Sequence, residues 1–137
     1  MGLILDSSVL ISAERQERNA RQVLAELAKK IGETDVAISV VTLIELVHGA
    51  TRADTSQRKL KREKFIEELL IAMPVYPVSV AIALRTGRLD AGNQIQGFRV
   101  PLPDLLIGVT ALERGYSVAT SNLRHFQQIS GLKVVRL

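Results

Sequence analysis

Short, mostly apolar runs alternate along the chain with longer amphipathic stretches. The runs at 2–5, 36–40, 75–78 and 117–120 are continuous rather than alternating, which is typical of strands buried in a parallel sheet. Pro77 interrupts the third run and predicts an edge strand. A fifth run at 132–136 predicts a final strand.

Apolar residues recur at helical spacing between these runs. The spacing predicts helices over 19–31, 42–52, 56–72, 79–96 and 104–115, with short helices after Asp6 and over 122–128. The helix over 56–72 is predicted to turn four residues inward: Leu60, Ile66, Leu69 and Leu70. The helix over 79–96 is predicted to pack through one apolar face: Val80, Leu84, Gly87, Ala91 and Ile95.

The element order is therefore β-α-α-β-α-α-β-α-α-β-α-β. Alternation of this kind predicts an α/β fold with a mainly parallel sheet of four to five strands and helices on both faces, a three-layer α/β/α sandwich. With 137 residues, 47% of them hydrophobic, the chain fits a single domain over 1–137.

The amino-acid composition excludes several kinds of active site and metal site. The chain has no cysteine and two histidines, so thiolate nucleophiles and Cys-based zinc sites are excluded, and an oxygen-ligated cation such as Mg²⁺ or Mn²⁺ is favoured. The N-terminus lacks the features of a signal peptide and no run of 18 apolar residues occurs, so we expect a cytoplasmic protein without a membrane span. The net charge of +4 slightly favours a polyanionic partner.

Four polar residues are predicted to meet at one edge of the sheet. Asp6 ends the first strand, Glu45 lies in the first turn after the second, and Asn122 follows the fourth. Asp104 joins them if its helix begins on the same edge. Open parallel sheets bind ligands beyond the carboxyl ends of their strands, so distant residues can form one pocket there.

Each of these residues also has a structural explanation. Asp6 and Asn122 fit helix caps, Thr42 and Glu45 fit a T-x-x-E capping box, and Asp104 fits the positive end of a helix dipole. Together, however, crowded carboxylates repel one another and are stable mainly around a divalent cation. Such a cation lowers the pKa of a bound water and directs it at phosphorus.

Four segments carry a family resemblance: 3–11 (LILDSSVLI), 39–49 (SVVTLIELVHG), 103–107 (PDLLI) and 119–126 (ATSNLRHF). In this order they resemble PIN-domain proteins of the VapC type, the toxins of prokaryotic toxin–antitoxin pairs. The resemblance spans essentially the whole chain.

The resemblance implies a PIN-like α/β/α sandwich and Mg²⁺- or Mn²⁺-dependent endoribonuclease activity on RNA. It implies Asp6, Glu45 and Asp104 as the acidic metal site and as catalytic residues, with Asn122 where the family often has Asp. It also implies inhibition by a small cognate antitoxin and frequent assembly as a homodimer or toxin–antitoxin hetero-oligomer.

Histidine and basic residues lie outside this acidic set. His48 is expected to pack or hydrogen-bond on its helix, and His125 to play a structural part beside Phe126 or to border the pocket. The basic stretch 52–64 is typical of a solvent-exposed helix face. Residues closer to the pocket are better candidates for guiding RNA: Arg85, Arg88, Arg99 and Arg124.

Two alternatives stay open. A phosphoacceptor receiver-like signalling domain has a similar length and an acidic Mg²⁺ pocket, but Asp6 is followed by Ser7 and no Asp ends the third strand. A nonenzymatic interaction module, whose carboxylates only cap helices, predicts no response to metal. A dinucleotide-binding domain is disfavoured because no GxGxxG follows the first strand.

Overall fold

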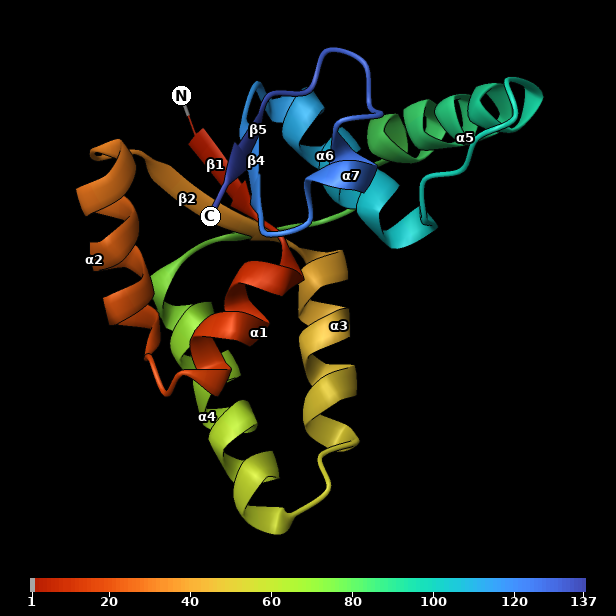
Figure 1. Cartoon of the computed structure of the whole chain (residues 1–137). Helices are drawn as coiled ribbons and strands as arrows, with labels where there is room; N and C mark the ends of the chain where they lie inside the picture. Colours follow the sequence, from red (N-terminus) through yellow and green to blue (C-terminus); the bar gives the residue numbers. More distant parts are fainter. Residues whose placement is uncertain (1) are drawn as a thin grey trace.

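The computed structural model describes residues 2–137, and its elements follow the predicted order (Figure 1). The strands are β1 (Gly2–Leu5), β2 (Asp35–Ser39), β3 (Val75–Tyr76), β4 (Ser117–Thr120) and β5 (Val134–Arg136). The helices are α1 (Ser7–Arg15), α2 (Ala20–Ile31), α3 (Val40–Thr51), α4 (Ser56–Ala72), α5 (Val80–Ile95), α6 (Leu102–Arg114) and α7 (Leu123–Phe126). Within 2–137, no helix has the length and apolarity needed to cross a membrane.

All strand pairs are parallel, and the sheet order is β3-β2-β1-β4-β5. The β3 strand lies at an edge, as Pro77 predicted. From β1 the chain moves outward to β2 and β3, and then returns to place β4 and β5 on the other side of β1. The winding direction therefore changes between β1 and β4, the position where open α/β sheets form ligand sites.

Two apolar cores cover the two faces of the sheet. Leu3 and Leu5 of β1 point into a core formed with α1 to α4, whereas Ile4 points into a second core formed with α5 to α7. Because successive residues of a strand face opposite sides, one apolar run supplies both cores. Figure 1 shows the helices on either side of the sheet, and the three-layer prediction is confirmed.

The predicted start of α3 is wrong by two residues. Ser39 is the N-cap, and its hydroxyl accepts a hydrogen bond of 3.0 Å from the Val41 N–H, so the helix begins at Val40. Thr42 is fully buried and its Oγ1 has no hydrogen-bond partner. The proposed capping box between Thr42 and Glu45 therefore does not exist, because Ser39 already caps the helix and Glu45 lies one turn further in.

The orientation of α5 also differs from the prediction. Val80, Leu84 and Ile95 were expected to face inward, yet they are 77%, 53% and 87% exposed. The helix instead buries Ile82 and Thr86 as it packs on α6. Figure 1 shows α5 extending away from the sheet, so its outer apolar stripe is left on the surface.

A smaller deviation affects α4. Leu60 and Leu70 are 67% and 48% exposed, whereas Phe65, Ile66 and Leu69 form the buried side. The inward face is thus rotated from the predicted one, because Phe65 at the centre of the helix packs into the core of α1 to α4.

Candidate functional site

Asp6 is fixed at the carboxyl end of β1. Its side chain is buried and caps α1, with Oδ1 accepting a hydrogen bond of 2.8 Å from the Ser7 N–H. The hydroxyls of Ser8 and Thr120 each donate to Oδ2 at 2.8 Å. Thr120 is the last residue of β4, so the change in winding direction between β1 and β4 joins these groups. The cap expected from the sequence is real, and it also orients the carboxylate.

Glu45 lies in the second turn of α3 and is half-buried. Its Oε1 is buried without a hydrogen-bond partner. Burial raises the pKa of the Glu45 carboxyl above its ordinary value of 4.5, and a hydrogen bond from the Ser7 side chain partly lowers this pKa again. The negative charges of Asp6 and Asp104 raise this pKa further, which shows that three carboxyl groups from separate segments share one neighbourhood.

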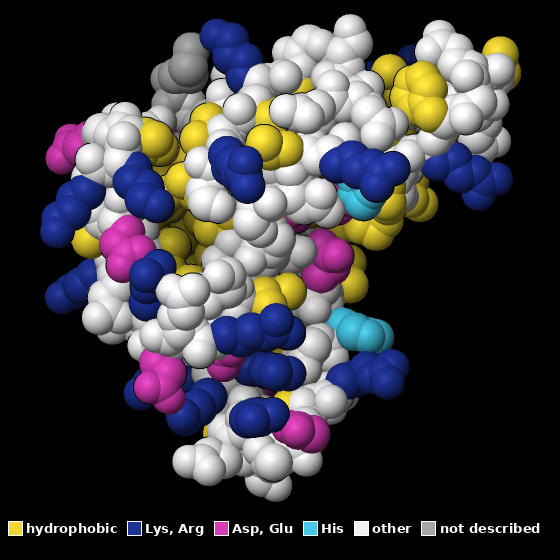
Figure 2. Space-filling model, viewed as in Figure 1, with side chains coloured by type: hydrophobic (Ala, Val, Ile, Leu, Met, Phe, Trp, Pro, Cys, Tyr) yellow, Lys and Arg dark blue, Asp and Glu magenta, His cyan; other side chains and the backbone are white. Residues whose placement is uncertain are grey.

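Asp104 is the third residue of α6, whose first turn begins at Leu102 rather than at Asp104. Burial raises the pKa of the Asp104 carboxyl above its ordinary value of 3.8, a hydrogen bond from His125 lowers it, and Asp6 raises it. His125 Nδ1 lies 2.6 Å from Asp104 Oδ2. Figure 2 shows acidic and histidine side chains gathered between the α3–α4 surface and the α6–α7 surface.

Asn122 joins the cluster through its backbone. Its N–H donates a hydrogen bond of 2.9 Å to Thr120 Oγ1, which in turn donates to Asp6. The Asn122 side chain is exposed and makes no capping hydrogen bond to α7. The structure therefore brings Asp6, Glu45 and Asp104 together, and it places Asn122 at the rim.

Two residues of this site were undervalued from the sequence. The sequence predicts Thr120 only as the end of a strand. Its hydroxyl, which ends a buried strand paired with β1, is the signal that could have indicated the contact with Asp6. The sequence predicts for His125 either a structural part beside Phe126 or a place at the border of the pocket, and it gives no sign of the contact with Asp104, which lies 21 residues away on another helix. Only the packing of α7 on α6 brings these two side chains together.

The carboxylate oxygens of this site suit a hard cation, although they do not form a complete ligand shell. No three acidic or histidine side chains within residues 2–137 converge closely enough to enclose a metal ion by themselves. Carboxylate oxygens are the ligands that Mg²⁺ and Mn²⁺ prefer, and Mg²⁺ keeps several waters, so an incomplete protein shell fits it. The unpartnered, buried Glu45 Oε1 is the oxygen that most needs a positive charge.

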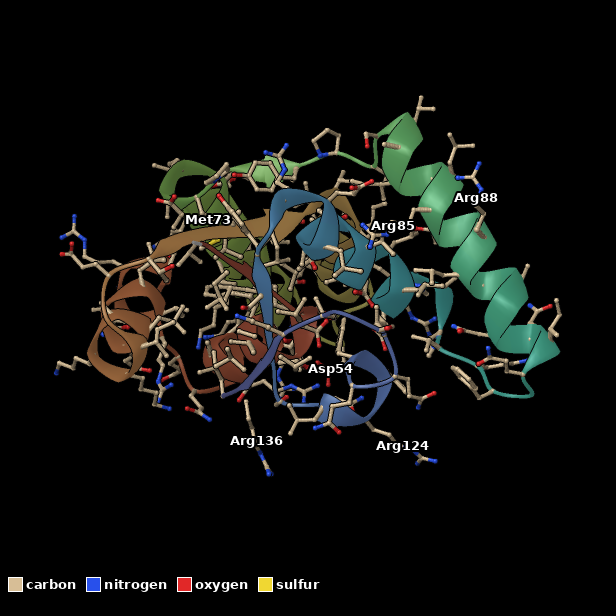
Figure 3. The ribbon with its side chains drawn as sticks, turned by 90° about the horizontal axis from the view of Figure 1, so that it is seen from above. Asp54, Met73, Arg85, Arg88, Arg124 and Arg136 are labelled. Atoms are coloured by element: carbon tan, nitrogen blue, oxygen red, sulfur yellow. The ribbon has the colours of Figure 1, made fainter. Side chains whose placement is uncertain are left out.

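The histidine and arginine residues singled out from the sequence differ in their exposure and in their contacts. His48 is exposed on α3 rather than packed. Arg85 lies between α5 and α6, where it pairs with Glu113 at 3.5 Å (Figure 3). Arg88 and Arg124 point outward from α5 and α7 in the same view. Of these arginines, Arg124 is the one adjacent in sequence to His125, and it is exposed.

The parallel sheet and its acidic edge agree with the resemblance to a PIN domain. The family model described as PIN domain matches residues 3–132, so the chain belongs to the PIN-domain family. Within this family the chain is similar to proteins named VapC. It is 30% identical over 135 residues to Ribonuclease VapC1 of Rickettsia felis, covering 98% of this chain and 96% of that protein.

A second curated relative and two solved structures also carry VapC or VapBC names. The chain is 32% identical over 103 residues to the tRNA(fMet)-specific endonuclease VapC of Shigella flexneri, covering 75% and 76% of the two chains. VapBC2 from Rickettsia felis, bound to a promoter DNA fragment, superposes with a TM-score of 0.83 at 22% identity, covering 100% and 99%. VapBC-5 from Mycobacterium tuberculosis superposes at 0.77 and 28% identity, covering both chains fully. The PIN fold and the VapC resemblance are confirmed, and a receiver domain is not supported.

Proposed function

We propose that this chain is a Mg²⁺- or Mn²⁺-dependent endoribonuclease and the toxin of a toxin–antitoxin pair. Asp6, Glu45 and Asp104 hold the cation, and Asn122 completes the catalytic set from the rim. The relatives named ribonuclease and endonuclease VapC support RNA as the substrate. The net charge of +4 and the exposed Arg124 beside the site suit a polyanionic chain.

One observation carries the metal site. Glu45 Oε1 is buried without a hydrogen-bond partner, and the charges of Asp6 and Asp104 both raise the pKa of its carboxyl. If these carboxylates were only structural, hydrogen-bond donors would satisfy both oxygens of Glu45, as they do for Asp6. Glu45 instead has a hydrogen bond from the Ser7 side chain that lowers its pKa, and its Oε1 has no partner. A divalent cation at this edge relieves both the missing partner and the repulsion.

The residues around this edge of the sheet have separate roles in the proposed reaction. A bound cation supplies an activated water and positive charge beside the phosphodiester. Thr120, Ser8 and the Ser7 N–H fix the Asp6 carboxylate before substrate arrives. The Asn122 amide, exposed at the rim, is free to bind a water or a phosphate oxygen of the RNA. No serine, cysteine or histidine nucleophile is required.

Two kinds of assembly are part of the proposal. The superposing structures are VapBC toxin–antitoxin complexes, so a small antitoxin is the proposed inhibitory partner. A second copy of this chain is the proposed partner for the apolar stripe exposed on α5. One superposing complex is bound to a promoter DNA fragment and another is bound to DNA, which is consistent with a hetero-oligomer formed with the antitoxin.

RNA cleavage by the antitoxin-free protein tests the proposal. We expect cleavage with Mg²⁺ or Mn²⁺, its loss in EDTA and its return when the metal is restored. Asp104→Asn keeps the shape of the side chain and removes its charge, so we expect cleavage to fall on the order of 10²-fold or more. Mg²⁺ should also raise the melting temperature of the parent protein, because it binds only the folded chain.

Asp54→Asn is the matched control, because Asp54 is exposed and forms a surface ion pair with Arg58. This variant should cleave RNA and respond to metal like the parent. Asp6→Ala is a weaker test, since it also removes the cap of α1. Cleavage that persists in EDTA, or a metal response that survives in Asp104→Asn, would exclude the proposed site. A folded parent with neither response would favour the nonenzymatic module.

A further inference from the structure

His125 makes a short contact with an acidic residue of the proposed site. Its Nδ1 lies 2.6 Å from Asp104 Oδ2, and the two side chains are 30% and 18% exposed. An ionised carboxylate only accepts hydrogen bonds, so the Nδ1–H of His125 donates to Asp104. This distance is slightly shorter than the roughly 2.7–2.9 Å typical of charge-assisted N–H···O hydrogen bonds.

Contacts other than this bond hold α7 against α6. Phe126, the next residue, is fully buried, and together with Ile129 it packs against α6 at Gly108. The Gln127 N–H donates to the Leu123 carbonyl at 2.9 Å and closes the helical turn. Apolar packing and backbone bonds therefore hold the segment, and the half-exposed imidazole is available for another role.

The bond restrains one oxygen of Asp104 and leaves the other outside it. A short aspartate side chain on the first turn of a helix has a terminal torsion that rotates broadly unless a partner fixes it. A hydrogen bond at Oδ2 selects one orientation of the carboxylate plane. Groups behind a metal ligand commonly act this way, and their loss weakens metal binding 10- to 100-fold.

We propose that His125 is a positioning residue that holds the Asp104 carboxylate, through Oδ2, in the orientation that binds the divalent cation. This inference rests on the proposed metal site. It assigns His125 no proton transfer and no contact with substrate. It requires a donor at the place of Nδ1, and it does not require an imidazole ring.

That requirement distinguishes the role experimentally. His125→Ala removes the donor, whereas His125→Asn keeps an N–H donor at the δ position. We expect His125→Ala to weaken Mn²⁺ binding by about 10- to 100-fold in calorimetric titrations without RNA. His125→Asn should restore the affinity to within about threefold of the parent, well inside that loss. His48→Ala, which removes an exposed histidine from α3, should bind as the parent does.

Thermal unfolding in EDTA separates positioning from folding. All three variants should melt near the parent temperature, because the buried Phe126 holds α7. Equal Mn²⁺ affinity of His125→Ala and the parent would overturn the proposal while leaving the metal site intact. Equal weakening in His125→Asn and His125→Ala, or a large loss of melting temperature in His125→Ala, would also overturn it. A folded parent that binds no Mn²⁺ would overturn the metal site itself, and this inference with it.

Discussion

The surroundings of Glu45 favour the neutral form of its carboxyl group. Its Oε1 is buried without a partner, and two carboxylates lie close enough to repel it. Glu45→Gln keeps the shape of the side chain and removes the charge. We therefore expect the metal-free variant to gain at most about 1 kcal/mol in free energy of unfolding at neutral pH, because solvent partly screens a half-buried carboxyl, while losing the stabilisation by Mg²⁺. Urea unfolding in EDTA and in Mg²⁺ measures both effects.

The pH dependence of this gain has a definite sign. The pKa of the Glu45 carboxyl in the folded chain is raised above 4.5, and that of Asp104 above 3.8. The folded chain then holds these protons to higher pH than the unfolded chain does. The stability they contribute is complete below the ordinary values, and it is lost as the pH rises through the raised pKa values. The advantage of Glu45→Gln in EDTA should therefore be small near pH 4 and grow toward pH 7.

Glu63→Gln provides the control for this pH dependence. Glu63 is exposed on α4, so the same chemical change there should leave the difference from the parent small at every pH. An advantage of Glu45→Gln that does not change with pH would contradict the electrostatic explanation. A loss of stability at neutral pH would show that the hydrogen bond from Ser7 to the Glu45 carboxylate outweighs burial and repulsion.

The sequence predicts part of this site for a physical reason. Asp6 stands out because a charged residue directly follows a buried apolar strand, and Asp104 because it lies in the first turn of an apolar helix. The role of Thr42 was misjudged because Ser39, three residues earlier, is an equally good cap and is the one used. His125 was undervalued because its contact depends on how two helices pack, which spacing along one helix does not encode.

At the scale of elements, hydrophobic spacing located the strands and helices well. The bounds of α4 and β4 are as predicted, since a long periodic helix and a short buried run give distinct patterns. Which side of a helix faces inward was less predictable. In α5 the stripe at Val80 and Leu84 is as regular as the buried side at Ile82, so periodicity does not decide between them. Contact with α6 decides it.

Gly108 lets α6 approach the segment after α7. A Cβ at this position would lie 2.5 Å from Cδ1 of Ile129 and 3.3 Å from Cδ2 of Leu132. Ile129 is itself buried, so it has little room to move. We expect Gly108→Ala to lower the free energy of unfolding by about 1–2 kcal/mol, because overpacking outweighs the gain in helix propensity.

Gly92→Ala on α5 is the matched control for this substitution. A Cβ there would meet no atom within 4 Å, so the variant should be unchanged or more stable by up to about 1 kcal/mol. Urea unfolding of both variants measures the difference. If Gly108→Ala were as stable as Gly92→Ala, the α6 contact would be looser than the structure has it, and the support it gives His125 would be doubtful.

At the scale of the whole molecule, the winding of the sheet explains why the site lies where it does. Because β1 sits between β2 and β4, the ends of these strands bring Asp6, the start of α3 and Thr120 to one edge. The order of elements predicted a parallel sheet with helices on both faces. The order of the strands in the sheet could not be predicted from the order of elements along the chain, because several sheet topologies satisfy the same alternation of strands and helices.

The exposed stripe of α5 makes self-association testable. Val80, Leu84 and Ile95 line the outer face of a helix that extends from the body, with Gly87 and Ala91 between them. Large residues around a small-residue centre allow two copies of one helix to approach closely and to bury the same patch on each chain. We expect the antitoxin-free protein to have twice the 15.0 kDa mass of one chain in light scattering.

Leu84→Glu should shift this mass to that of a single chain, because a two-fold interface would place two new carboxylates in an apolar contact. Ile71→Glu is the control, since Ile71 of α4 is 89% exposed and lies outside the stripe. That variant should keep the doubled mass. In the parent the melting temperature should rise with protein concentration, as mass action requires, and this dependence should vanish in Leu84→Glu alone. A monomeric parent, or a dimer that survives Leu84→Glu, would show that α5 does not bind a second copy and would leave its stripe to a different partner.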